Sequence, residues 1–207
     1  MITLHHLNQS RSKRIIWLLE ELGVDYTIRA YQRDTATNLA PAALKAIHPL
    51  GKSPVIEEDG FVLAESGAIT ESLIDRFAPD TLAPPRGTQA FAEYQQWIHF
   101  AESSAMVPTL LKIFLAMDGT ETQFLAGYAD TELKKVMGYL DQVLADKTYF
   151  VAGKLTGADI MMSFIPELLE RLGVLSGYPN LQRYHQHLSS LPLYQKANQL
   201  EAQYDNQ

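Results

Sequence analysis

Two short apolar runs on either side of an acidic tip constrain the fold of this chain more than any other feature. Residues 48–72 read HPLGKSPVIEEDGFVLAESGAITES, and residues 54–56 and 61–64 form the two runs. The Asp-Gly pair between them is typical of a tight β-hairpin, because both residues tolerate the positive φ angles of such a turn. A helical pattern begins directly afterwards, at Ser66. The sequence therefore predicts a hairpin that leads straight into a helix.

Pro54 stands at the head of the first run, where its missing N–H places it at a strand entrance or an edge. The Ser53–Pro54 bond is a candidate cis peptide, and a cis bond would turn the Ser53 backbone outward. Backbone groups left unpaired at such a bend can dock an extended peptide in the manner of an added strand. Lys52 is the nearest cation.

The helix that begins at Ser66 offers an anion site, because its first N–H groups lack partners within the helix and lie at the positive end of its dipole. Glu65, directly before it, can hold an ammonium group. With Lys52 and the backbone near Pro54, these groups suit a short zwitterionic peptide that has a carboxylate at each end.

The preceding residues predict a strand, a helix and a second strand within about thirty residues, which is a βαβ unit with parallel strands. Residues 1–6 suit a strand, apolar positions from Ser10 to Gly23 recur at helical spacing, and residues 26–31 suit the second strand. A weaker helical pattern covers residues 36–47. With the hairpin and its helix, the predicted order is β-α-β-α-β-β-α.

Ser10 falls at the start of the first predicted helix. As an N-cap it would stabilise the helix by about 1 kcal/mol, and its hydroxyl could equally donate to a thiolate held over the helix end. Arg11, Lys13 and Arg14 fill the first turn, where the helix dipole disfavours cations. A local rule broken in this way often marks a functional site. A solvated basic face, or a structural carboxylate paired with Arg14, is the alternative.

A proline-rich stretch, APDTLAPPRG at residues 78–87, favours an extended linker. Beyond it every apolar pattern is helical, and a break is expected at Pro108. Further helices are predicted over residues 121–146, 179–188 and 193–202. In LTGADI, Thr156 and Asp159 have the spacing of a capping box, which we interpret as a buried structural cap.

Residues 48–72, the segment SRSKRIIWLLEEL from Ser10 and LTGADI stand in an order and at separations that resemble cytosolic glutathione transferases. The likeness is to the bacterial and fungal branch with a Ser-Arg motif after the first strand, and it covers nearly the whole chain. It implies an α/β thioredoxin-like N-terminal domain over residues 1–79, which binds glutathione. It also implies an all-α C-terminal helical domain over residues 87–207, which contributes the electrophile site.

The resemblance further implies a homodimer that activates the glutathione thiol as a thiolate and conjugates it to small apolar electrophiles, with glutathione as co-substrate and no other cofactor. The implied roles are a thiolate donor at Ser10, a partner of the glycyl carboxylate at Lys52, backbone pairing at Ser53 before Pro54, and γ-glutamyl contacts from Glu65 and Ser66. Other branches use a tyrosine near the first strand. Here Asn8, Ser12 or backbone groups remain alternative donors to the thiol.

The electrophile is expected between the loops of the first domain and the helix over residues 89–117, near Phe100, Ser103, Ser104 and Met106. A non-catalytic glutathione-binding protein of the same fold would share these features. So would a glutathione-dependent isomerase, dehalogenase or peroxidase, because each uses the same thiolate on a different electrophile. The sequence does not distinguish among them.

Composition excludes several other classes. A formal net charge of −7 argues against a nucleic-acid partner, because no basic stripe is present to neutralise phosphates. The absence of cysteine removes disulfides and thiol nucleophiles, so any sulfur chemistry must use the ligand's sulfur.

Neither a secretion signal nor a run of 18 apolar residues is found, so we expect a cytoplasmic protein without a membrane span. His5 and His6 point to opposite faces of a strand, which argues against a metal site.

Overall fold

The computed structural model describes residues 1–205. The chain divides into two compact units. The first comprises Met1–Leu82 and the C-terminal residues from Ser190, and the second comprises Ala83–Ser189.

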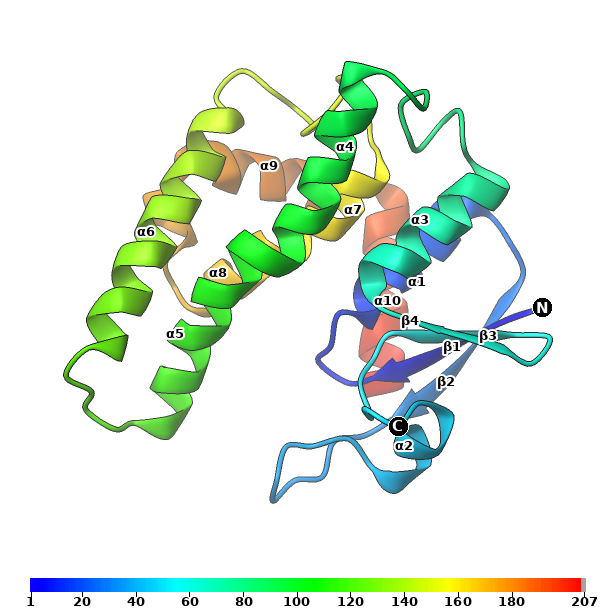
Figure 1. Ribbon diagram of the computed structural model, residues 1–207, viewed down its shortest axis with the longest axis horizontal. Coiled ribbons are helices and arrows are strands. Elements are labelled where there is room, and N and C mark those ends of the chain that lie inside the picture. The colour runs from blue at the N-terminus through cyan, green and yellow to red at the C-terminus, as the bar shows by residue number, and fades with distance from the viewer. Residues whose placement is uncertain (206–207) are drawn as a thin grey trace. The chain divides into compact units, whose positions relative to one another are not determined.

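The first unit is built on a four-stranded sheet of order β2-β1-β3-β4 (Figure 1). β1 and β2 are parallel, whereas β1 with β3 and β3 with β4 are antiparallel, which confirms the predicted βαβ unit and hairpin. The strands are β1 Ile2–Leu7, β2 Tyr26–Tyr31, β3 Val55–Glu58 and β4 Phe61–Ala64, and the helices are α1 Ser12–Leu22, α2 Ala42–Ile47, α3 Ser66–Phe77 and α10 Pro192–Asp205.

The hairpin turn has the geometry that the sequence predicts. Asp59 and Gly60 have φ angles of 51° and 81°, so both central residues lie in the left-handed region that a type I′ turn requires. The helix expected over residues 36–47 is shorter and begins only at Ala42. Asp34 accounts for the difference, because its carboxylate accepts the N–H groups of Ala36 and Thr37 and holds this segment as a turn.

Alternation along β1 sends successive side chains to opposite faces of the sheet. Leu7 packs with Tyr31 and Leu44 in a small core beneath α2. His6, which faces the other way, bonds to Ser12 of α1. In Figure 1 the helices α1, α3 and α10 lie on this second side of the sheet.

Helix α10 packs on α1 and so belongs to the first unit, although the sequence assigns residues 193–202 to the helical domain. The Trp17 and Tyr194 rings meet edge to face at 4.9 Å. Lys13 of α1 pairs with Glu201 of α10 at 3.6 Å. The sequence pattern predicts a helix with recurring apolar positions here, but it does not show that residues 12–19 are all buried or which distant segment covers them.

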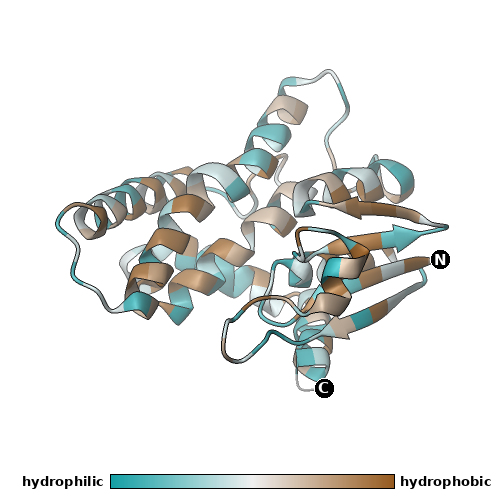
Figure 2. Cartoon of the chain, turned by 60° about the horizontal axis from the view of Figure 1, so that its bottom comes forward, coloured by the Kyte–Doolittle hydropathy of each residue, from teal (hydrophilic) through white to brown (hydrophobic). Residues whose placement is uncertain are grey.

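The second unit is helical, as predicted, and apolar and polar segments follow one another along its helices in Figure 2. Its elements are α4 Gln89–Phe100, a π-helical turn Ala101–Ala105, α5 Met106–Asp118, α6 Leu125–Val143, α7 Gly157–Met162, α8 Phe164–Arg171, a 3₁₀ turn Leu175–Gly177 and α9 Pro179–Ser190.

The break expected at Pro108 lies one turn earlier. Pro108 is inside the first turn of α5, and the irregularity is the π-helical turn that precedes it. Proline has no N–H to donate to the carbonyl of Ser104 and its ring crowds that group. The wider π-helical turn is a common way to accommodate such a mismatch.

One helical stretch, residues 89–118, is long and apolar enough to cross a membrane by length and composition alone. Core helices of proteins without any membrane span meet the same criterion, so this is weak evidence for a membrane segment.

The predicted capping box is present at the start of α7. Asp159 is fully buried and accepts hydrogen bonds from the Thr156 N–H at 2.9 Å, the Phe150 N–H at 3.0 Å and the Tyr184 hydroxyl at 3.2 Å. Burial raises the pKa of this carboxyl to about 6, although these donors act in the opposite direction. Asp159 therefore joins α7, α9 and the loop before α7 through one side chain.

Asp159→Ala should lower the free energy of unfolding by about 3 kcal/mol or more, because four buried donors, the Phe150 N–H, the Thr156 N–H and hydroxyl, and the Tyr184 hydroxyl, lose their acceptor at once. Urea denaturation at neutral pH measures this loss. Asp130→Ala is the matched control, since Asp130 is an exposed partner of Lys112 and should contribute about 0–1 kcal/mol. Equal losses for the two variants would contradict the structural role of Asp159.

Candidate functional site

The register of the sheet brings the predicted glutathione-binding segments to one end of the first unit. Val55 pairs with both His5 and Ala64, so Pro54 and Glu65 occupy the next positions at the same end of β3 and β4. Helix α3 begins immediately after Glu65. Strand β1 also ends here, at Leu7, three residues before Ser10. Segments about fifty residues apart in the chain thus meet at one sheet edge.

The Ser53–Pro54 peptide is cis, as the sequence suggested. The Ser53 hydroxyl donates to the His5 carbonyl at 2.8 Å and accepts the Leu7 N–H at 3.1 Å. The side chain of Ser53 therefore continues the ladder between β1 and β3. Within residues 1–205, the Ser53 backbone forms no backbone hydrogen bond, so its N–H and C=O are available to an added strand.

Glu65 and Ser66 form the entrance to α3. Glu65 has a φ angle of +72°, a conformation that costs a non-glycine residue about 1–3 kcal/mol and is concentrated at binding sites. Its side chain is exposed, whereas Ser66 is 4% exposed. No acidic residue lies in the first turn of α3, so its terminal N–H groups can receive an anion. Lys52 is exposed two residues before Pro54.

Ser10 is not the N-cap of α1. The helix begins at Ser12, and the N-cap position belongs to Arg11, which makes no side-chain cap. The Ser10 hydroxyl nevertheless accepts the Ser12 N–H at 3.3 Å and lies 2.8 Å from the Ser12 hydroxyl. Ser10 is 6% exposed. Ser10 stands one residue before the N-cap position. Its bond to the Ser12 N–H therefore takes the place of a regular N-cap.

The basic residues of α1 have a structural explanation. The Lys13 ammonium pairs with Glu201 and lies 5.2 Å from the centre of the Tyr194 ring. Arg14 is 1% exposed, so its guanidinium is inside the unit and not on a solvated face. The packing of α10 thus accounts for the charge of Lys13, one of the three cations that the sequence pattern linked to a functional site.

Two polar residues that sequence reasoning missed lie behind Ser10. His6 Nδ1 is 2.6 Å from the Ser12 hydroxyl, and His6 Nε2 is 2.9 Å from the carboxylate of Asp205. Burial lowers the pKa of His6, and Asp205 offsets part of this effect. The alternation of side chains along β1 could have shown that His6 points into the unit. Nothing in the sequence connects His6 to Asp205 at the other end of the chain.

Asn8, an alternative donor to the thiol, lies in the turn after β1. Its side-chain oxygen accepts the Arg33 N–H at 2.9 Å, and its carbonyl accepts from the Arg33 side chain at 3.2 Å. Both bonds use acceptor atoms of Asn8, so its side-chain amide N–H groups stay an alternative donor to the thiol.

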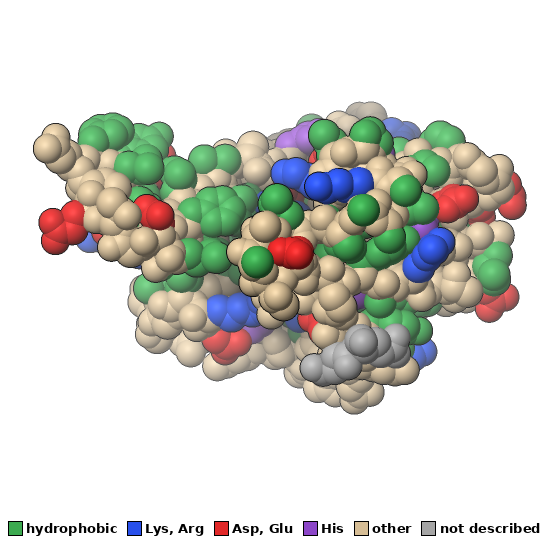
Figure 3. Space-filling model, turned by 90° about the horizontal axis from the view of Figure 1, so that it is seen from below, with side chains coloured by type: hydrophobic (Ala, Val, Ile, Leu, Met, Phe, Trp, Pro, Cys, Tyr) green, Lys and Arg blue, Asp and Glu red, His purple; other side chains and the backbone are tan. Residues whose placement is uncertain are grey.

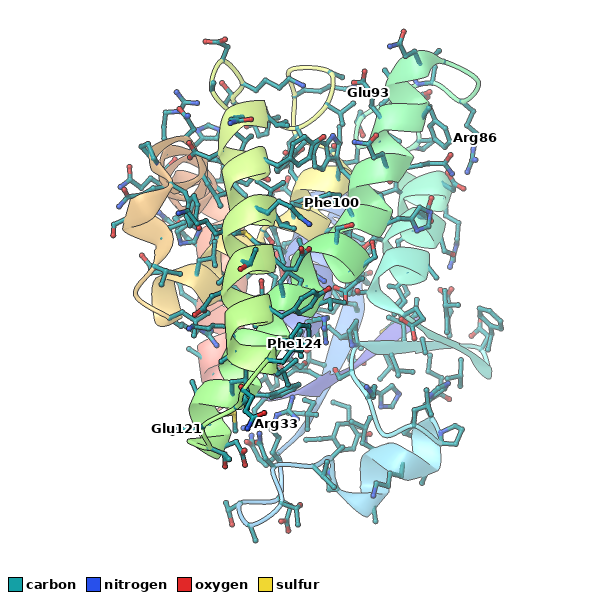
Figure 4. The ribbon with its side chains drawn as sticks, turned by 60° about the vertical axis from the view of Figure 1, so that its left-hand side comes forward. Arg33, Arg86, Glu93, Phe100, Glu121 and Phe124 are labelled. Atoms are coloured by element: carbon teal, nitrogen blue, oxygen red, sulfur yellow. The ribbon has the colours of Figure 1, made fainter. Side chains whose placement is uncertain are left out.

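The second unit contains a hollow of about 660 Å³ between α4, the π-helical turn, α5 and α6. Phe100 projects from α4 and contacts Tyr139 of α6 with ring centres 5.9 Å apart (Figure 4). Met106, which the sequence placed near the electrophile, is only 2% exposed and does not line the hollow. The lining residues are Phe100, Ser103, Ser104, Val107, Pro108, Leu111, Tyr128, Glu132, Lys135, Val136 and Tyr139.

Apolar side chains are also exposed where α5 and α6 join, as the green atoms at that end of the second unit in Figure 3 show. Phe114, Met117 and Phe124 are each more than half exposed. Among residues 1–205, no group of three or more His, Asp or Glu side chains has the arrangement of a metal site.

A thioredoxin-like unit with an open backbone beside a cis-proline, joined to a helical unit, defines the class of glutathione transferases. Residues 1–73 match the family description "Glutathione S-transferase, N-terminal domain", and residues 103–192 match "Glutathione S-transferase, C-terminal domain".

Individual relatives are also glutathione S-transferases. Glutathione S-transferase 3 of Schizosaccharomyces pombe is 35% identical over 93% of this chain and 84% of its own length. The crystal structure of a glutathione S-transferase from Actinobacillus pleuropneumoniae is 36% identical, with a TM-score of 0.88 over 98% of this chain and 93% of that one. The chain belongs to the glutathione S-transferase family.

Two more distant matches bear on the ligand and on the range of proteins that share this fold. A glutathione transferase homologue from Lodderomyces elongisporus, described with two GSH per subunit, has a TM-score of 0.84 over 96% of this chain and 98% of that one, at 22% identity. Elongation factor 1-gamma of Danio rerio is 33% identical over 72% of this chain, which spans 34% of that protein.

Ser53→Ala should lower the free energy of unfolding by about 1–2 kcal/mol, because the His5 carbonyl and the Leu7 N–H lose their shared partner. Thermal or urea denaturation measures this effect. Ser103→Ala is the control, since Ser103 is exposed and bonds only within its own helix, and it should change stability by about 0.5 kcal/mol or less. If both variants are as stable as the parent, Ser53 does not hold β1 to the proline loop.

Proposed function

We propose that this protein binds glutathione at the sheet edge of the first unit and conjugates its sulfur to small apolar electrophiles. The observation that carries the proposal is the meeting of the Ser53–Pro54 backbone with Glu65 and the start of α3. In this arrangement Glu65 and Ser66 hold the γ-glutamyl end, the Ser53 backbone pairs with the cysteinyl part, and Lys52 faces the glycyl carboxylate. The Lodderomyces homologue, described with two GSH per subunit, supports glutathione as the ligand of this fold.

The chemistry required of the site is removal of the thiol proton. A thiol with a pKa of about 8.5 is only a few per cent ionised at neutral pH, and each unit by which its pKa falls corresponds to about 1.4 kcal/mol. The start of α1 and a hydroxyl donor at Ser10 favour the thiolate. The thiolate then attacks an electrophilic carbon, a carbon–sulfur bond forms, and the leaving group or an adjacent double bond takes the electron pair.

We assign the electrophile to the hollow of the second unit. Phe100, Ser103 and Ser104 line it, and the mixture of aromatic walls and few polar groups suits a small apolar molecule. Met106, which the sequence placed in this site, is buried and is not among the lining residues. A homodimer in the cytoplasm without a resident cofactor is part of the same proposal.

A non-catalytic binding protein is the second candidate, and the likeness to elongation factor 1-gamma favours it. Titration of the thiolate absorbance of bound glutathione distinguishes the two, with a blank that lacks the protein. A pKa clearly below that of free glutathione supports activation, whereas binding with an unshifted pKa supports the non-catalytic role. Product analysis with different electrophiles then separates transferase from isomerase, dehalogenase and peroxidase activity.

Ser66→Ala should weaken glutathione binding by about 1–3 kcal/mol, because a nearly buried carboxylate loses a hydrogen-bond partner. Isothermal titration calorimetry measures the dissociation constant. Ser72→Ala, on the same helix α3 and outside the proposed site, should bind as the parent does. An unchanged dissociation constant for Ser66→Ala would contradict the assignment of the γ-glutamyl end of glutathione to Ser66.

Ser10→Ala should raise the pKa of the bound thiol while leaving the affinity for glutathione nearly intact, because the hydroxyl is assigned to the ionised sulfur and not to the peptide. The thiolate titration and a conjugation assay measure the two effects. If the pKa and the rate both stay at the parent's values, Asn8, Ser12 or backbone donors carry the role.

A further inference from the structure

Four polar side chains form a continuous line inside the first unit. The Ser10 and Ser12 hydroxyls are 2.8 Å apart, Ser12 is 2.6 Å from His6 Nδ1, and His6 Nε2 is 2.9 Å from Asp205. His6 and Ser12 are fully buried. The members come from β1, the turn after it, α1 and α10, so the line exists only in the folded unit.

The chemistry of the groups sets the direction of these hydrogen bonds. A carboxylate only accepts, so His6 carries its proton on Nε2 and its Nδ1 is an acceptor. The Ser12 hydroxyl must then donate to Nδ1, and the Ser10 hydroxyl donates to Ser12. Burial lowers the pKa of His6, which favours this neutral form in the resting protein.

In the resting state the Ser10 proton therefore points inward, away from any ligand. Its oxygen accepts one hydrogen bond, from the Ser12 N–H, and has a second lone pair. A thiol brought to Ser10 can donate its S–H to that lone pair. Ser10 in this state can accept a proton but cannot stabilise a thiolate.

We infer that His6 receives the thiol proton of bound glutathione through Ser12 and Ser10. The S–H bond breaks and its proton passes to Ser10, the Ser10 proton passes to Ser12, and the Ser12 proton passes to His6 Nδ1. The sulfur keeps the electron pair. This inference rests on the proposed function, because it assumes that the thiol lies at Ser10.

The transfer reverses every hydrogen bond in the line. His6 now donates to Ser12, Ser12 donates to Ser10, and Ser10 donates to the thiolate. One proton movement thus both ionises the thiol and supplies its stabilising donor. The imidazolium that forms is paired with Asp205, as an acid partner stabilises a charged histidine in other proton-transfer sites.

Charged groups of both signs lie at this end of the unit. Arg33, labelled in Figure 4, lies 3.5 Å from the Gln9 carbonyl, and Arg11 and Asp205 both influence the pKa of its guanidinium. The Gln9 N–H also donates to Asp205, at 3.4 Å. Glu65 stands at the same end of the sheet, beside Ala64 of β4. For His6 itself, burial lowers the pKa and the carboxylate of Asp205 raises it.

The test is nitrogen NMR of the wild-type protein labelled with ¹⁵N-histidine, with thiolate absorbance recorded on the same samples during glutathione titration. His6 should change from the neutral Nε2–H form to the imidazolium in step with thiolate formation. A pH indicator in weak buffer should report fewer protons released than thiolates formed. Thiolate formation with a neutral His6, and one proton released for each thiolate, would overturn the relay but not the proposed function.

Variants separate the relay from mere structural support. Ser12→Ala interrupts the line and should abolish the His6 signal change, whereas Ser12→Thr retains the hydroxyl and should restore it. His187→Gln is the matched control, because His187 bonds to Tyr149 in the second unit and should leave the titration unchanged. A wild-type protein that forms no thiolate with glutathione overturns the proposed function and the relay together.

Discussion

The pairing of β3 with both β1 and β4 is the constraint on which the rest of the first unit depends. It fixes the end of the hairpin opposite the end of β1, and the Ser53 side chain extends that pairing by one more position. Pro54 and Glu65 are consequently held at the same edge, next to the open backbone of Ser53. A shift of the register by one residue would turn the buried faces of these short strands to solvent, so the edge is strongly determined.

A second constraint is the packing of α10 on α1. It buries Trp17 against Tyr194 and pairs Lys13 with Glu201, which explains the position of Lys13 in the first turn of α1 without any ligand. The same packing brings Asp205 to His6. One structural contact between the two ends of the chain therefore also places a carboxylate behind the turn that carries Ser10.

The two units carry different parts of the proposed chemistry. The first provides backbone groups, a helix start and buried hydroxyls, which are suited to a peptide and to an ionised sulfur. The second provides aromatic walls and a hollow lined in part by the π-helical turn before Pro108. In the second unit, Asp159 caps α7 and joins it to α9. It is remote in sequence from every residue of the hollow, so substitutions that change stability and substitutions that change specificity can fall on different residues.

The strands, the hairpin turn, the candidate cis peptide bond before Pro54 and the capping box at Thr156 could be predicted from the sequence, because each depends on neighbouring residues and on local backbone preferences. The positions of Ser10, Glu65 and Ser66 near predicted helix starts also made them candidate site residues. The sequence did not reveal that Ser10 lies before the helix, that Met106 is buried, or that His6 meets Asp205. Those facts depend on packing between segments far apart in the chain, and no local pattern records which distant surface a helix will cover.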